Sequence, residues 1–356
     1  MSLKRATVLE VVETRRERQT LQVRVKDQAE SIKAYNYLGL GSSVVVGQSV
    51  LVNTTGIDLE LGTGGVAFVV PSEPFVEDTR YGHIIKLRYS PLQRAVDAAE
   101  EQNAPSHELL QNAQSIQGMP AVCAELHSQM PLVAAAIKHQ NPQISIAYLM
   151  NDAASLPMAV SDLVSQCTQA ELINYTISCG QAFGGEYEAI NLYSALLTAR
   201  HVCEAQVAIV APGPGVVGSD TVFGHSGIAQ GEALNAVTVL EGKPIAPLRL
   251  SWNDLRKRHQ GLSHHSATAL GRVCLGKALI PLPGDLDKQQ SDELMGQLED
   301  SGILNKHTLE TIQHDFSAIS TRGIVVTTMG RGREEDPAFF SAAFAAGIQA
   351  ARVVEP

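Results

Sequence analysis

Residues 206–219 read QVAIVAPGPGVVGS, a run of small and β-branched apolar residues that passes directly into a glycine-rich loop. Near-continuous apolar strands of this kind are typical of a sheet that is covered on both faces. Similar runs alternate with helical stretches along the chain, at 121–126, 144–150, 173–179, 244–250, 277–282 and 324–328. This alternation predicts βαβ units and a doubly wound, mostly parallel, Rossmann-like α/β domain.

The pattern differs before residue 80. Short runs rich in Val, Ile, Thr and Tyr are separated by Gly or polar turns, at 7–12, 21–25, 31–35, 44–52 and 66–70. Five short strands at this spacing predict a small closed barrel, since closure removes exposed strand edges. We therefore expect a β-barrel-like domain at 1–80, a connector at 81–117 and the α/β domain at 118–356.

Composition limits the class of protein. The 356 residues are enough for two cores, and 44% hydrophobic against 18% charged residues is typical of globular chains. A net charge of -10 makes nucleic acids and acidic membranes poor partners. We expect a cytoplasmic protein, because the first twenty residues carry charges throughout and the five cysteines form no CxxC pair. A homo-oligomer is left open.

Ligands of open parallel sheets bind where the strands end and the loops lead into helices. The expected ligand-binding residues in these loops are Ser128, Gly213, Gly215, Gly218, Ser219 and Arg331. The three glycines spell G-x-G-x-x-G and would let backbone N–H groups approach an anion. A dinucleotide is disfavoured, because Pro214 occupies the first variable position and no acidic strand end follows about 20 residues on. A phosphate or carboxylate cradle and a plain crossover loop both stay open, and Arg331 is either an anion clamp or structural.

The candidate catalytic residues are titratable groups at the same loop tips, namely His127, Asp152, Cys179, His264 and His265. Cys179 is expected at a strand end ahead of a helix, a setting that lowers a thiol pKa, although buried strand cysteines are common. Ser263 is expected to cap a helix that carries both His264 and His265 on its first turn. Adjacent helical histidines point about 100° apart, so we predict no metal site, and structural packing remains an alternative.

Several motifs carry a family resemblance, at 53–58 with 61–65, at 82–89, 126–129, 179–185, 213–215, 263–265 and 327–332. Through them the whole chain resembles the bacterial domain-of-unknown-function family 3866. The resemblance implies that these stretches mark a common site, but it supplies no reaction and no catalytic residue. It also implies that residue 225 is usually not histidine in the family, so a role for His225 would be particular to this chain.

The leading functional hypothesis is a hydrolase or transferase acting on a small anionic, phosphate-bearing metabolite. The alternatives are a non-catalytic metabolite-binding sensor and an NAD(P)-dependent oxidoreductase. Titratable groups on several loop tips favour the enzyme, since a sensor needs only complementarity to its ligand. The sequence identifies no cofactor.

Overall fold

The computed structural model describes residues 2–15, 17–60, 65–71 and 82–354. Contacts divide the chain into two compact units, Met1–Val96 and Asp97–Pro356. The stretch expected to be a connector is therefore shared between the two units. Residues 61–64, which belong to one of the family motifs, lie outside the described residues.

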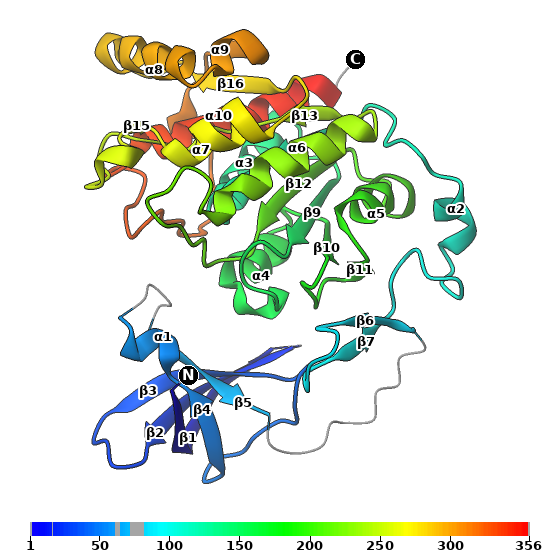
Figure 1. The fold of residues 1–356 in the computed structure, drawn as a ribbon, viewed down its shortest axis with the longest axis vertical. Helices are drawn as coiled ribbons and strands as arrows, with labels where there is room; N and C mark the ends of the chain where they lie inside the picture. The colour runs from blue at the N-terminus through cyan, green and yellow to red at the C-terminus, as the bar shows by residue number, and fades with distance from the viewer. Residues whose placement is uncertain (1, 16, 61–64, 72–81, 355–356) are drawn as a thin grey trace. The chain divides into compact units, whose positions relative to one another are not determined.

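The first unit contains the closed barrel that the sequence predicts (Figure 1). Its strands follow the order β1-β2-β3-β5-β4, and β3 pairs with β5 in parallel. Two register shifts in β1 let this long strand bend and pair with both β2 and β4. The elements are β1 (Leu3–Arg15), β2 (Arg18–Val25), β3 (Ser31–Tyr37), β4 (Ser49–Asn53), α1 (Thr55–Asp58) and β5 (Val66–Val70), followed by the hairpin of β6 (Ile84–Lys86) and β7 (Arg94–Val96).

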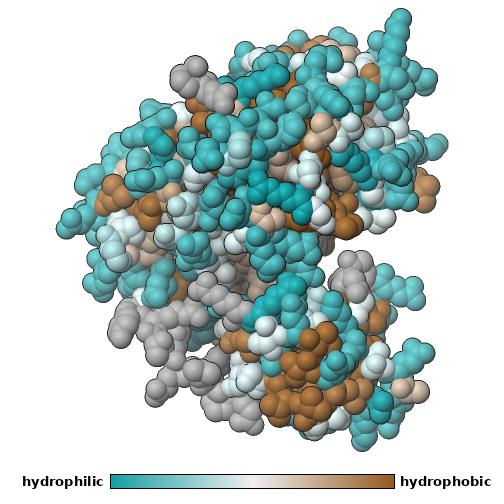
Figure 2. Space-filling model, turned by 180° about the vertical axis from the view of Figure 1, so that it is seen from behind, coloured by the Kyte–Doolittle hydropathy of each residue, from teal (hydrophilic) through white to brown (hydrophobic). Residues whose placement is uncertain are grey.

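The barrel unit buries a small aliphatic core that includes Leu21, Val23 and Val52. It also leaves Val12, Val45 and Val46 more than half exposed. Figure 2 shows hydrophobic surface on this unit. An apolar surface patch of this kind does not by itself define a partner.

The second unit is built on an eight-stranded sheet of order β11-β10-β9-β12-β8-β13-β16-β17, in which each pair of neighbours is parallel. This confirms the mostly parallel α/β domain. The strands are β8 (Pro120–Cys123), β9 (Ile146–Asn151), β10 (Tyr175–Cys179), β11 (Tyr187–Ala189), β12 (Val207–Pro212), β13 (Lys243–Ile245), β16 (Leu279–Pro283) and β17 (Thr308–Ile312). A separate antiparallel pair, β14 (Leu250–Ser251) and β15 (Gly261–Leu262), follows β13 along the chain.

Helices cover both faces of the sheet (Figure 1). Along β8, Ala121 and Cys123 face one core, whereas Val122 faces the other. The two cores explain why the strands are apolar without alternation. The helices are α2 (His107–Gln111), α3 (Gln129–Gln140), α4 (Asp162–Gln169), α5 (Leu192–Leu197), α6 (Ala229–Val239), α7 (His264–Thr268), α8 (Lys288–Asp300), α9 (Ile303–Lys306) and α10 (Pro337–Val354).

One predicted strand is wrong. Residues 324–328 form no ladder strand, although Ile324 and Val326 are buried against the core while Val325 is 80% exposed. The alternation arises because an extended segment packs on the core without a neighbouring strand. The eighth strand is instead β17, whose short, partly exposed sequence TLETI carries little apolar signal.

Helix α10 is long and apolar enough to cross a membrane by length and composition alone, but 78% of this stretch is buried inside the fold. It packs against α3 and β16 in one of the two cores. Burial of this kind is typical of a central core helix.

The contact between α10 and α3 yields a prediction with a matched control. A Cβ atom at Gly347 in α10 would lie 2.4 Å from the Val133 carbonyl oxygen in α3, whereas one at Gly296 in α8 would meet nothing within 4 Å. Gly347→Ala should therefore lower the free energy of unfolding by roughly 1–3 kcal/mol, and Gly296→Ala should raise it by about 1 kcal/mol. Urea unfolding followed by circular dichroism measures both. Stabilisation by both variants would contradict this packing.

Candidate functional site

The candidate site lies past the carboxyl ends of three neighbouring strands. The loop after β8 supplies Glu125, the loop after β12 supplies Gly218 and His225, and the segment after β13 supplies Arg249. The remaining histidines come from η4 (Lys257–His259) and from the start of α7. Segments up to 140 residues apart thus meet at one edge, as the rule for ligand sites of parallel sheets predicts.

A buried ion pair forms the base of the site. Arg249 Nη1 lies 3.0 Å from Glu125 Oε1, and the Glu125 side chain is fully buried. Ser266 Oγ donates to Glu125 Oε2 at 2.8 Å, and His265 Nδ1 lies 3.1 Å from Oε1. Burial alone would raise the pKa of Glu125, but Arg249 and these hydrogen bonds lower it to about 2. Glu125 is therefore an ionised acceptor at neutral pH.

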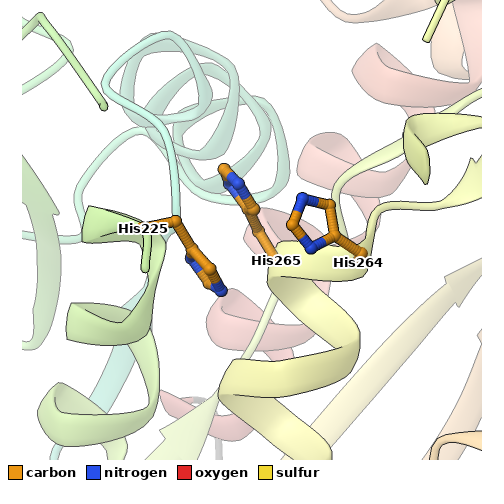
Figure 3. A group of neighbouring side chains, drawn as sticks. All are labelled: His225, His264 and His265. Atoms are coloured by element: carbon orange, nitrogen blue, oxygen red, sulfur yellow. The ribbon is translucent and has the colours of Figure 1, made fainter. Parts of the chain in front are cut away.

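Four histidine rings gather above this pair. The His225 ring stacks on the His265 ring with centroids 3.9 Å apart, and the His264 and His265 centroids are 4.4 Å apart (Figure 3). The His259 centroid lies 5.0 Å from those of both His264 and His265. Burial lowers the pKa of His264 to about 4 and that of His259 to about 3, with neighbouring positive groups adding to the effect. Both rings are neutral at pH 7.

The cluster borders a small pocket of about 70 Å³, several times the roughly 10–15 Å³ that one water molecule requires. Its lining combines cations, histidines and apolar groups, namely Leu126, Val216, Val217, Gly218, Arg249, Arg256, Arg258, His259, His265 and Met329. Arg256 is held by both carboxylate oxygens of Asp254. Among the described residues, the one ion-pair partner of Arg258 is Asp220, whose side chain is 82% exposed. An exposed pair of this kind is weak, so the Arg258 guanidinium is more readily available to a ligand than that of Arg256.

Local interactions place the histidines. Ser263 accepts from the backbone N–H of His265 and so caps α7, which confirms the prediction for this helix start. The Ser263 hydroxyl also lies 2.8 Å from His259 Nδ1. Gly218 packs closely against two of these histidines, because a Cβ atom there would lie 3.0 Å from His265 Nε2 and 3.1 Å from His225 Cβ.

Two buried glutamines connect the loops beneath the site. Gln129 Oε1 accepts from the backbone N–H groups of Glu125 and Leu126, and its Nε2 donates to the Leu248 carbonyl. Gln230 Nε2 donates to the carbonyls of Cys123 and Pro247. Together they bridge the chain after β8 to the chain after β13.

Three predicted catalytic residues lie at neighbouring strand ends but are not among the residues that line the pocket. His127 Nδ1 bonds the Pro212 carbonyl at 3.0 Å and its Nε2 bonds Ser161 Oγ at 2.6 Å. Asp152 Oδ2 accepts from the backbone N–H of Gln181. Cys179 is buried and is followed by a turn and β11 instead of the expected helix, because α5 begins only at Leu192.

Of the predicted ligand-binding residues, only Gly218 is among the described residues that line the pocket. Gly215 has a positive φ of 102° with open space around it. A Cβ atom at Gly213 would meet Ser155 Oγ at 2.2 Å, which indicates close packing at that position.

The other three predicted residues, Ser219, Ser128 and Arg331, are not among the residues that line the pocket. Ser219 bonds Thr221 and the Gly224 carbonyl within its own loop. Ser128 precedes α3 without a capping bond from its side chain. Arg331 lies between the carboxylates of Asp254 and Asp336, which favours the structural interpretation over the anion clamp.

Sequence reasoning missed Glu125, His225 and Arg249 as site residues. No local pattern marks them, since each is a single polar residue whose partner lies far along the chain. The run 256–265, which contains three basic residues and three histidines, was the available signal for His259. For Glu125 the sequence offers only a weak indication, which is a lone carboxylate directly after an apolar run that forms a strand.

A larger groove of about 340 Å³ lies on the barrel unit and includes Arg5, Arg24 and Lys26. Among the described residues that line it there is no histidine or cysteine. The pocket beside the histidine cluster gathers titratable groups from several loops at the strand ends, so it is the better candidate site.

The fold and site define a two-unit protein in which a five-stranded barrel is joined to a mostly parallel α/β domain. The family model described as Protein of unknown function (DUF3866) matches residues 33–347, and the chain belongs to this family. No curated protein and no solved structure matches the chain.

Proposed function

We propose that the α/β domain is an enzyme of the hydrolase or transferase class that acts on a small anionic metabolite in the histidine pocket. The observation that carries this proposal is the lining, in which Arg258 stands beside His259 and His265 in one pocket. Guanidinium groups recognise phosphate and carboxylate oxygens in bidentate fashion, and a neutral imidazole can accept a proton from a reacting group.

The rim supports a ligand with an apolar part as well. Val217 and Met329 line the same pocket and are 67% and 59% exposed. Apolar side chains with a few convergent polar groups are typical of small-molecule sites. The favoured ligand is therefore a phosphate-bearing metabolite whose anionic end contacts Arg258 and whose remainder contacts these two side chains.

The alternatives have less support. A non-catalytic sensor requires only a complementary surface, whereas this pocket brings together titratable groups from several loops. A dinucleotide-dependent oxidoreductase is disfavoured further by topology, because β12 lies between β8 and β9, and the dinucleotide-binding order has the first two strands adjacent.

Inorganic phosphate should raise the melting temperature of the wild-type protein, since a ligand at a hundredfold excess over its Kd stabilises the folded state by about 2.7 kcal/mol. Arg258→Gln should weaken phosphate binding by about 10- to 100-fold, because it removes a charge-assisted hydrogen bond. Thermal scans at fixed ionic strength, with chloride replacing phosphate, measure the shift.

Arg352→Gln is the matched control. Arg352 is exposed near the end of α10. The carbonyl of the next residue, Val353, contacts Lys243 at the amino end of β13. Arg352 therefore lies at the edge of the sheet opposite to the candidate site. Equal shifts in the two variants, or no shift with phosphate, would contradict an anion site at Arg258. Release of phosphate from a panel of phosphate esters then separates an enzyme from a sensor, which would bind them unchanged.

A further inference from the structure

His225, His264 and His265 lie close together, and of the three only His265 lines the pocket proposed for the anion. One ring nitrogen from each lies within 4.8 Å of the others. Two of the three residues come from the first turn of α7 and the third from the loop after β12, just ahead of η3 (Ser226–Ile228) (Figure 3). The expectation of no metal site considered only the adjacent pair on the helix, and His225 adds a third direction of approach.

Hydrogen bonds decide which nitrogens carry lone pairs. His265 Nδ1 lies 3.1 Å from Glu125 Oε1 and 3.3 Å from Arg249 Nη1, and the Glu125 carboxylate, which pairs with Arg249, only accepts. The shorter of the two contacts therefore places the proton of His265 on Nδ1 and its lone pair on Nε2. His225 Nε2 lies 3.1 Å from the Val222 carbonyl, which also only accepts, so the lone pair of His225 is on Nδ1. Metal-bound histidines characteristically donate their other ring N–H to a carboxylate or a backbone carbonyl in this way.

Two of the nitrogens left over have no partner. His225 Nδ1 and His264 Nε2 are buried and have no hydrogen bond to any described residue. Buried polar atoms are otherwise paired in folded proteins, because an unmade hydrogen bond costs about 1–3 kcal/mol. Two such atoms on neighbouring rings point to one partner that both of them contact.

We propose that His225, His264 and His265 bind a divalent transition-metal ion of the zinc type, with Glu125 as the carboxylate that positions His265. Three imidazole nitrogens without a carboxylate suit Zn²⁺ and exclude Mg²⁺ and Ca²⁺, which take oxygen ligands. Zn–N bonds of about 2.0–2.1 Å place tetrahedral ligands roughly 3.4 Å apart. The planes of the His225 and His265 rings are only 3° apart, so one of these rings must rotate out of the stack before both lone pairs point at one ion. His265 also lines the pocket, so an ion bound to it would lie beside the space proposed for the ligand.

The test uses Zn²⁺ alone, without phosphate, so that it succeeds or fails independently of the anion site. The full-length protein is stripped with a chelator, dialysed and titrated with Zn²⁺ against a chromophoric competitor. We expect one ion per chain by elemental analysis and a loss of affinity of at least 10-fold in His225→Ala and in His264→Ala. His139→Ala removes an exposed histidine and should bind as wild type does.

Folding and coordination are checked in the same variants. Circular dichroism establishes that each variant is folded, and Co²⁺ substitution gives an absorption spectrum that reports tetrahedral nitrogen ligation and should be lost in His264→Ala. Failure of the folded wild type to bind Zn²⁺ stoichiometrically would overturn the proposal. Undiminished binding by folded His225→Ala and His264→Ala would overturn it equally, because the ion would then lie elsewhere.

Discussion

Glu125→Ala is expected to lower the free energy of unfolding of the α/β domain by about 3–5 kcal/mol. The substitution leaves the Arg249 guanidinium, which is itself buried, without its partner at 3.0 Å. It also removes the acceptor of Ser266 and His265. Removal of one member of a buried ion pair is costly because an uncompensated charge stays in a low dielectric. Chemical denaturation of the wild type and of Glu125→Ala, measured side by side, gives the difference in the free energy of unfolding.

Asp220→Ala is the matched control, because it breaks the exposed pair with Arg258 and should change stability little. A double variant sharpens the test. Glu125→Leu combined with Arg249→Met removes both charges, so it should be less destabilising than the sum of the two single changes. Additive losses would show that the two side chains do not act as a pair.

Acidification from pH 6.5 to pH 4 should lower the free energy of unfolding of the wild type. The decrease should be about 3 kcal/mol larger than the decrease in His127→Gln. Burial lowers the pKa of His127 from 6.5 to about 4, with the bond to Pro212 opposing the shift. Between these values the unfolded chain binds a proton that the folded chain does not, so stability falls as the pH falls. Above about pH 7.5 the ring is almost entirely neutral in both states and contributes little pH dependence.

Burial keeps His127 neutral, and the contact with Ser161 suits the neutral ring. Its Nδ1 donates to the Pro212 carbonyl, and Ser161 Oγ, which already accepts from the Val164 N–H, donates to Nε2. A proton on Nε2 would turn this last bond into a contact between two donors. Glutamine can make the same two bonds without titrating. Unfolding measured at half-unit pH steps, with the exposed His139→Gln as control, checks the difference, and parallel pH profiles for wild type and His127→Gln would contradict it.

Much of the fold could be predicted because its signals are local. The barrel strands and the apolar strands such as β12 stand out by their β-branched residues and by the turns between them. Residues 324–328 show the limit of this reasoning, because burial of Ile324 and Val326 produces the alternation of a strand without any strand beside it. The edge strand β17 was missed for the opposite reason, since it is largely exposed.

The candidate site could be predicted only in part. The loop tips, Gly218 and the histidines of α7 follow from the rule that ligands of parallel sheets lie at strand ends. The link from His265 to Glu125 spans 140 residues and depends on which strands are neighbours in the sheet, which the sequence does not state. Arg331 was open for the same reason, because Asp254 and Asp336 approach it only in the folded chain.

The two buried glutamines change the shape of the sheet itself. The last ladder pair between β8 and β13 is Val122 with Ile245. Beyond it the two chains are bridged by the amides of Gln129 and Gln230 in place of direct backbone bonds. A side-chain amide is wider than a direct bond, so the sheet is split at this edge, and Glu125 and Arg249 come from opposite sides of the split. Both glutamine bridges are uncharged and do not titrate, whereas the Glu125–Arg249 pair that spans the same split is charged.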